Sequence, residues 1–299
     1  MATFGSMADE VGRKLAGYTL RNDRQTHLIS SLNSTSLGIN VASAENVSNG
    51  IIEINDELIY VDSYDRVGGV LNIPPYGRGY SGTNPRLHAT GSRVVVSPTF
   101  PRIDVKEALN ETIQAVFPDL YATLTTTFNY SPAVTTYALP DDCETVLSVS
   151  YQSTGPSKEW IPVRNYRTDA SANTSAFNSR NSISIYSGVE TGRTVQVTYS
   201  SAPVVMESDD DDFGIVTGLP ESSKDVIVFG AAARLASFID PGRLTFGSAE
   251  SDQMSQVAGR SYGAGTNASK YLLAIYQQRL QEESRKLSDR NPIRVHFTR

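Results

Sequence analysis

The sequence predicts an α+β protein: a small N-terminal antiparallel β-barrel or sandwich domain, then a helical bundle with an inserted antiparallel β domain, then an extended C-terminal tail. Two segments, residues 21–98 and about 125–205, alternate apolar and polar side chains with period two, as half-buried strands do. Three segments, about 103–117, 221–239 and 267–287, repeat apolar side chains at helical spacing. The composition agrees, because the chain is 39% hydrophobic, 19% charged and contains 15 tyrosines, which favour strands.

Residues 1–20 are predicted to form an N-terminal helical or extended segment. Two glycines, Gly12 and Gly17, make this segment a poor helix in isolation. We therefore expect it to become ordered only against a partner or a neighbouring subunit. Its apolar side chains are spaced along one helix face: Met7, Val11, Leu15 and Tyr18.

Residues 21–98 are predicted to form a small accessory β domain. Strands at 51–54 and 58–61 flank the turn-compatible residues 55–57, which indicates a hairpin. The segment 74–83 is rich in glycine but lacks the Lys-Ser/Thr pair and the helix that a phosphate-binding loop requires. We expect it to be a loop that crosses the hairpin.

Residues 99–288 are predicted to form the main domain. Asp104 and Glu107 have capping-box spacing at the start of the helix 103–117, which is expected to end near Pro118. The β region at about 125–205 is predicted to be one sheet of about five strands. The sole cysteine, Cys143, is expected to be a small buried hydrophobic residue.

Helices are expected again after Pro220. The helix 221–239 has small residues at 230–233, which permit close approach of another helix, and Asp-Pro-Gly at 240–242 is expected to stop it. One or two helical turns are expected at 248–257. The last helix, 267–287, is expected to end by Asn291 and Pro292, with residues 289–299 forming an extended docking arm.

No catalytic centre is predicted. The three histidines, His27, His88 and His296, are scattered along the chain without a motif partner, and no hydrolase, kinase, dinucleotide or zinc motif occurs. We expect no cofactor and no metal. The first residues carry Asp9 and Glu10 where an export signal needs its apolar run, and no apolar segment is long enough for a membrane span. A soluble protein made in a reducing cytoplasm is expected.

The sharpest local feature is a run of four carboxylates. A calcium loop needs ligands at alternate positions, a central glycine and a closing Glu, and this run lacks that pattern. A solvated, mutually repelling loop is the default interpretation. In a ring, the same loops would form a negative rim or channel that repels the DNA backbone and lets a duplex slide. The run consists of Asp209, Asp210, Asp211 and Asp212.

The C-terminus has the opposite charge from the block before it. Residues 206–284 carry 6 basic and 12 acidic side chains, whereas residues 285–299 carry 5 basic residues and only Asp289. Ile293, Val295 and Phe297 alternate as in a strand, which favours insertion into a partner, with the flanking arginines pairing with acidic groups there.

The order of these elements resembles the head-to-tail adaptor (connector) proteins of tailed bacteriophages. The likeness covers about residues 103–299 and rests on a capped helix, a β region that opens with Tyr-Ala-Leu-Pro-Asp-Asp at 137–142, Leu-Pro-Glu at 219–221 before an Ala-rich helix, and a long last helix with a tail. Separately, Glu-Leu-Ile-Tyr-Val at 57–61, Gly-Arg-Gly-Tyr-Ser-Gly-Thr at 77–83, His88 and Gly91 resemble a small β domain that recurs in phage virion proteins.

The resemblance implies a structural neck protein of the virion, not an enzyme. In that family the subunits form a homo-oligomeric ring, usually twelve-fold, beneath the portal, and the ring gives DNA a non-specific passage. The helical part makes the ring, the β part faces the next neck component (a stopper or tail-completion protein), and the tail docks on the portal. The implied portal contacts in this chain are Ile293, Arg294, Val295, Phe297 and Arg299.

Two other interpretations remain open at the sequence level. The chain could be a different tail or baseplate component, because the N-terminal β domain also suits that setting. It could also be a carbohydrate- or receptor-binding virion module, in which Trp160 and the tyrosines stack on sugars. A ring-sized mass would indicate the neck, whereas a trimer would favour the receptor binder.

Overall fold

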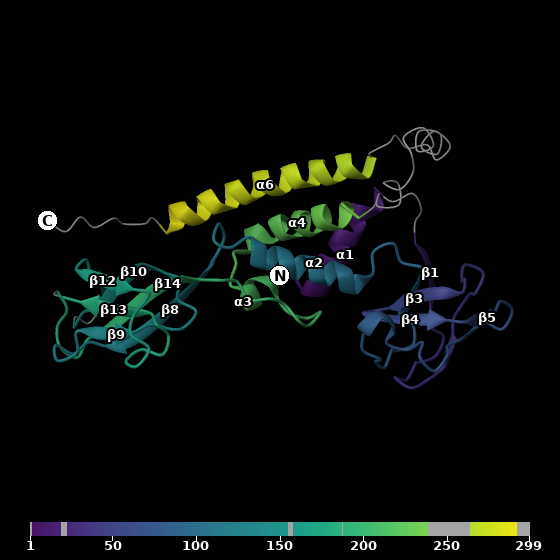
Figure 1. Cartoon of the computed structure of the whole chain (residues 1–299), viewed down its shortest axis with the longest axis horizontal. Helices are drawn as coiled ribbons and strands as arrows, with labels where there is room; N and C mark the ends of the chain where they lie inside the picture. The colour runs from purple at the N-terminus through teal and green to yellow at the C-terminus, as the bar shows by residue number, and fades with distance from the viewer. Residues whose placement is uncertain (1, 19–22, 155–157, 187, 239–263, 292–299) are drawn as a thin grey trace. The chain divides into compact units, whose positions relative to one another are not determined.

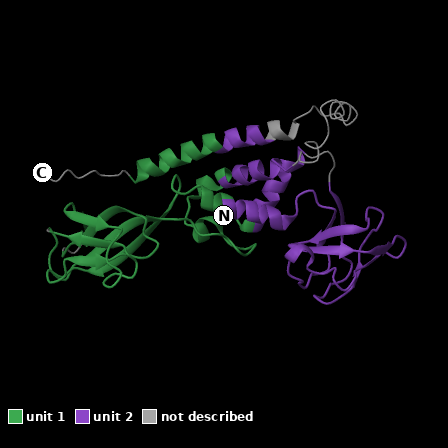
Figure 2. Cartoon of the chain, viewed as in Figure 1, with its two compact units in different colours: residues 1–4, 112–226, 277–299 green, residues 5–111, 227–276 purple. Residues whose placement is uncertain are grey.

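The computed structural model describes residues 2–18, 23–154, 158–186, 188–238 and 264–291. In these ranges the chain forms five α-helices and four antiparallel sheets, which confirms the α+β class (Figure 1). The chain divides into two compact units, coloured separately in Figure 2. Unit 1 comprises residues 1–4, 112–226 and 277–299, and unit 2 comprises residues 5–111 and 227–276.

The N-terminal β domain belongs to unit 2 and consists of two small sheets around one apolar core. The first sheet has the order β1 (Arg24–His27), β7 (Arg93–Val96), β3 (Gly50–Ile54), β4 (Glu57–Val61). The second has the order β2 (Gly38–Asn40), β6 (Val70–Asn72), β5 (Ser63–Asp65). The largest core residues are fully buried: Ile39, Ile52, Ile54, Ile59 and Leu71.

The predicted hairpin is confirmed as β3 and β4, joined by Asn55 and Asp56. Asn55 has φ 54°, a left-handed conformation that Asn adopts more readily than most residues. The glycine-rich loop runs against this hairpin, because the Tyr60 N–H donates to the Gly77 carbonyl. A Cβ added to Gly77 would lie 2.6 Å from the Tyr60 carbonyl oxygen, so this approach requires glycine.

Unit 2 also contains most of α1 (Phe4–Ala16), the N-terminal part of α2 (Arg102–Ala115), most of α4 (Lys224–Ala236) and the N-terminal part of α6 (Ala264–Arg290). The Lys14 ammonium lies 4.3 Å from the ring centroid of Phe229, so α1 packs beside α4. Met7, Val11 and Leu15 are buried, which confirms the predicted helix face. The rest of the chain buries this face without a second subunit.

The predicted cap of α2 was wrong, although the helix starts within one residue of the predicted position. The helix begins at Arg102, so Asp104 lies within its first turn and does not cap it. The Arg102 backbone N–H donates instead to the side chain of Glu53 on β3, and the Val105 N–H donates to the Pro101 carbonyl. The first turn is therefore capped by a carboxyl group distant in sequence.

The inserted β domain belongs to unit 1 and forms two sheets where the sequence predicted one. Its core includes Cys143, as predicted, with Val149, Ile183 and Val197. The four-stranded sheet has the order β11 (Trp160–Pro162), β10 (Thr145–Gln152), β14 (Thr194–Ser201), β8 (Ala122–Asn129). The three-stranded sheet has the order β12 (Tyr166–Asp169), β13 (Ser182–Ile185), β9 (Thr136–Ala138).

Short helical elements follow the insert in unit 1. They are α3 (Phe213–Thr217), which the sequence analysis missed, and the single 3-10 turn η2 (Glu221–Ser223). The predicted last helix is longer than expected, since α6 runs from Ala264 to Arg290 and includes the first residues assigned to the arm. Its Glu283 is buried and accepts a 2.6 Å hydrogen bond from Ser222. The predicted stop at 240–242 and helical turns at 248–257 lie outside the described residues.

Candidate assembly surfaces and charge clusters

The N-terminal β domain contains a fully buried charge cluster centred on Glu57. Arg78 donates to both carboxylate oxygens, from Nε at 2.7 Å and from Nη2 at 2.9 Å. His88 Nε2 lies 2.7 Å from Oε2. Asn55 Nδ2 lies 3.2 Å from His88 Nδ1, and an Asn amide there donates, so the ring proton that faces Glu57 is on Nε2.

Burial of Glu57 opposes ionisation, but hydrogen bonds outweigh it. The side chains of His88 and Arg78 and the backbone N–H groups of Arg86 and Gly79 together lower the pKa of Glu57 to about 2. Arg78 also donates to the backbone carbonyls of neighbouring loops. The cluster thus fixes the glycine-rich loop and leaves no open position for a substrate.

His88, for which the sequence offered no motif partner, is thus held by Glu57 and Asn55. The signal was present in the sequence, because the segments that resemble the recurrent phage β domain include Glu57, Arg78 and His88. Their contacts could not be read from spacing, since the Glu and the His are 31 positions apart. Three of the residues that carry this resemblance therefore form a structural charge cluster.

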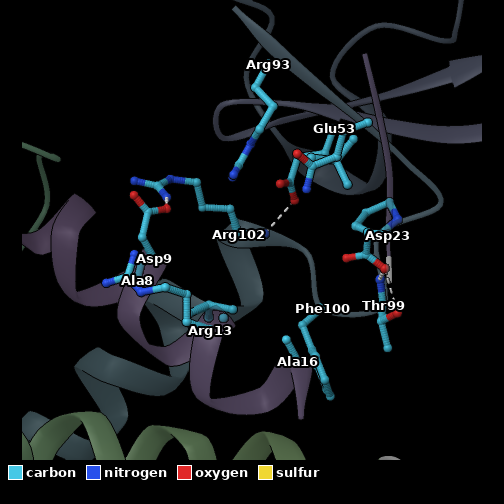
Figure 3. Close-up of a pocket in the computed structure, with 15 residues that line it drawn as sticks. Ala8, Asp9, Arg13, Ala16, Asp23, Glu53, Arg93, Thr99, Phe100 and Arg102 are labelled. Carbon is cyan, nitrogen blue, oxygen red and sulfur yellow. Dashed lines mark hydrogen bonds and ion pairs between the residues drawn. The ribbon is translucent and has the colours of Figure 1, made fainter. Parts of the chain in front are cut away.

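A pocket of about 420 Å³ lies within unit 2, where the β domain meets helices α1 and α2 (Figure 3). Arg102 pairs with Asp9 at 2.5 Å and with Asp56 at 3.2 Å. Lys106 Nζ lies 2.6 Å from the other Asp56 oxygen. These pairs join the turn between β3 and β4 to the start of α2.

Glu53 lines the same pocket and is almost completely buried. Desolvation raises the pKa of this carboxyl to about 7, although the Arg102 N–H and the charges of Arg102 and Arg93 act in the opposite direction. Glu53 caps the first turn of α2 and so links β3 to that helix. We assign no reaction to this pocket.

The acidic run is partly a structural element. The Asp211 carboxylate accepts two 2.8 Å hydrogen bonds from the N–H groups of Glu207 and Ser208, and they lower its pKa. Asp212 caps α3 by accepting from the Ile215 N–H. The run also pairs with the N-terminus, where the Phe4 N–H donates to the Asp211 carbonyl. These two carboxylates thus also stabilise the local backbone.

The other residues singled out from the sequence are those of the C-terminal arm, Trp160 and Cys143. Ile293, Arg294, Val295, Phe297 and Arg299 lie outside the described residues, which end at Asn291. Trp160 is partly exposed on β11. Burial and the neighbouring charges of Asp142 and Glu144 raise the pKa of the Cys143 thiol to about 11.

Neither a metal-binding cluster nor a membrane-spanning helix occurs in the described part of the chain. Among those residues, no group of three or more His, Cys, Asp or Glu side chains is placed to hold a metal ion. None of the helices in the same ranges combines the length and apolar character needed to cross a lipid bilayer.

Comparison with known families decides the assignment. A family model described as "SU10 adaptor protein" matches residues 87–294, which is more than half of the chain. The chain belongs to the SU10 adaptor protein family. The residues of this chain that match the family model include α2, the inserted β domain, α4 and α6. Nearly all of the N-terminal β domain precedes the matched residues. A search of curated proteins returned no match.

Family membership makes this chain a phage adaptor, and hence a structural protein of the virion that binds other virion components. It also places the chain among non-enzymes. The resemblance to phage adaptors drawn from element order is confirmed.

Proposed function

We propose that the adaptor forms a homo-oligomeric ring between the portal and the next neck or tail component, with a central passage for DNA. The observation that carries this proposal is the family match over the helices and their inserted β domain. Helices α2, α4 and α6 are proposed to form the ring, which we expect to be twelve-fold. The inserted β domain is proposed to face a stopper or tail-completion protein.

The C-terminal arm is proposed to dock on the portal. Its apolar side chains, Ile293, Val295 and Phe297, alternate with Arg294 and other polar residues, and this pattern suits an added strand. The arm follows directly from the end of α6 at Arg290, which provides a rigid base. Arg294 and Arg299 would pair with acidic groups on the portal.

Two measurements test these proposals. Native mass spectrometry of the purified adaptor should give the mass of a closed ring of many copies, whereas a monomer or a trimer would contradict the ring. A truncated chain that ends at Arg290 should keep the ring mass and lose co-assembly with the portal. Unchanged portal binding by the truncated chain would refute the arm's role.

The acidic run of Asp209, Asp210, Asp211 and Asp212 is proposed to face the DNA channel. Asp211 and Asp212 also bond to backbone N–H groups, so the test leaves those two residues unchanged. Negative side chains there would repel the phosphate backbone and prevent DNA from adhering. Changing both Asp209 and Asp210 to Lys should slow DNA ejection from virions that assemble normally. The control is Glu190→Lys, an exposed site on the inserted domain, and equal ejection rates in the two variants would contradict the proposal.

A further inference from the structure

The strand β8 is an edge strand that lacks the usual protection. It pairs with β14 along all eight of its residues, and no strand in the described ranges pairs with its outer side. Its sequence contains no charged residue and no proline. Edge strands normally carry charges, prolines or bulges, or are very short, because unpaired backbone groups bind other strands. An unprotected edge of this length indicates a surface that another chain covers.

The other outer strands of the inserted domain differ. At the opposite edge of the same sheet, β11 has three residues and ends in Pro162. In the second sheet, β12 carries Arg167 and Asp169 within four residues, and β9 at the other edge is only three residues long. These strands have the protection that β8 lacks.

An apolar groove of about 250 Å³ adjoins the first residues of β8 within unit 1. Three large apolar side chains line it and remain accessible: Ile215 is 74% exposed, Val204 59% and Leu124 38%. They come from α3, from the segment after β14, and from β8 itself. An edge strand and an apolar groove therefore form one continuous surface.

The charged side chains that line the groove are acidic, and no Lys or Arg is among the lining residues. Asp142 and Glu144 line the groove. The stretches 122–154 and 194–223, which supply β8, β10, β14 and α3, contain no Lys or Arg. An acidic surface of this kind favours a basic partner segment and disfavours an acidic one.

We propose that β8 and the adjoining groove bind an extended segment of another virion protein, in which apolar residues alternate with basic ones. The segment adds a strand to the sheet at β8, its apolar side chains contact Leu124, Val204 and Ile215, and its basic side chains pair with Asp142 and Glu144. This inference rests on the proposed adaptor role. An adaptor needs separate surfaces for two partners, and the C-terminal arm provides only one of them.

Photo-crosslinking identifies the protein segment that binds to β8 and the adjoining groove. A benzophenone amino acid is placed at Thr127 on β8, with Thr168 on β12 as the matched control, since both are exposed threonines on outer strands. In assembled virions, position 127 should cross-link to a segment of a different virion protein, and position 168 should not. A cross-link from position 127 to residues 292–299 of a second copy, or none at all, would overturn the proposal.

A pair of substitutions tests the groove separately from the ring. Ile215→Asp places a charge in the groove, whereas Val67→Asp changes an apolar side chain that is 98% exposed in the other unit. Loss of an apolar anchor weakens binding by about tenfold or more, so we expect a loss of that size in virion incorporation for Ile215→Asp alone. Its native ring mass should be unchanged.

Each other outcome contradicts the inference. Equal incorporation of the two variants would show that the groove takes no partner. A ring that dissociates on Ile215→Asp would show that a second copy occupies the groove. If instead the unsubstituted protein forms no ring, the proposed function fails independently of β8.

Discussion

At the scale of single residues, Glu57 shows how one carboxylate can organise a loop. Its side chain is inaccessible to solvent and binds Arg78, His88 and two backbone N–H groups. A buried charge of this kind is tolerated only when it is paired, and removing one partner leaves the others unpaired. The cluster therefore specifies the conformation of the loop from Gly77 to His88.

Removing the charge of Glu57 tests whether this buried cluster stabilises the β domain. Glu57→Gln should destabilise the N-terminal β domain by about 3–5 kcal/mol, because it leaves Arg78 buried without its counter-ion. Hydrogen exchange of the β3 and β4 amides reports the loss. Glu190→Gln is the control, since the pair between Glu190 and Arg193 is largely exposed and should contribute almost nothing. Equal protection in Glu57→Gln and the control would show that the cluster is not structural.

Glu53 gives a prediction with a defined pH window. Its pKa is about 7 in the folded chain and 4.5 as the reference value, so the folded state binds the extra proton between these limits. Stability contributed by Glu53 therefore falls as pH rises from about 4.5 to about 7. Glu53→Gln removes this titration while keeping an oxygen for the Arg102 N–H.

The measurement is the difference in urea midpoint between Glu53→Gln and the unsubstituted chain. It should be small at pH 4 and should favour the variant increasingly up to pH 8. Glu45→Gln, at an exposed position in the same β domain, should show no such trend. A difference that is constant with pH would contradict the assignment of a raised pKa to Glu53.

At the scale of elements, α1 is the clearest case of a helix stabilised by its packing. Its sequence contains a glycine at position 12 and would be marginal in isolation. Three apolar side chains on one face are nevertheless buried by the rest of the chain: Met7, Val11 and Leu15.

Two substitutions in α1 should change stability in opposite directions. Leu15→Ala should cost about 2–5 kcal/mol by leaving a cavity. Gly12→Ala should add about 0.5–1 kcal/mol, because Gly12 is exposed and a Cβ there would meet nothing within 4 Å. Chemical denaturation followed by circular dichroism measures both. If Leu15→Ala were neutral, the helix would depend on a partner subunit for its order.

The sequence predicted elements well where one local signal sufficed. Helices α1, α2, α4 and α6 and the hairpin β3–β4 all follow from periodicity and turn residues. The strand β8 was missed because its run of three threonines, 125–127, gives no apolar–polar alternation in the sequence, although Phe128 packs against the core of the inserted domain. The cap of α2 was misassigned because the capping residue, Glu53, lies 49 positions from Arg102 in sequence.

The candidate sites were predicted less completely than the fold. The acidic run was found, but its hydrogen bonds to backbone N–H groups depend on a turn that spacing does not reveal. The partners of Arg78 and His88 meet only when the β domain folds. The groove at Ile215 joins three segments that are far apart in sequence.

At the scale of the whole molecule, the chain is a phage adaptor with one apolar core in the N-terminal β domain and another in the inserted β domain. The family match covers the helices and the inserted domain, and nearly all of the N-terminal β domain precedes the match. That β domain has its own core and its own buried cluster. The match begins at residue 87, so of the strands of this domain it includes only β7.

The central claim is the position of the adaptor in the virion neck, and selective labelling tests it most directly. Cys143 is the sole cysteine and is buried, so Val67→Cys provides one accessible thiol. Gold-labelled virions are then imaged at low resolution by electron microscopy. The account predicts a ring of label at the junction between head and tail. Label at the tail tip or baseplate, with the junction unlabelled, would contradict it.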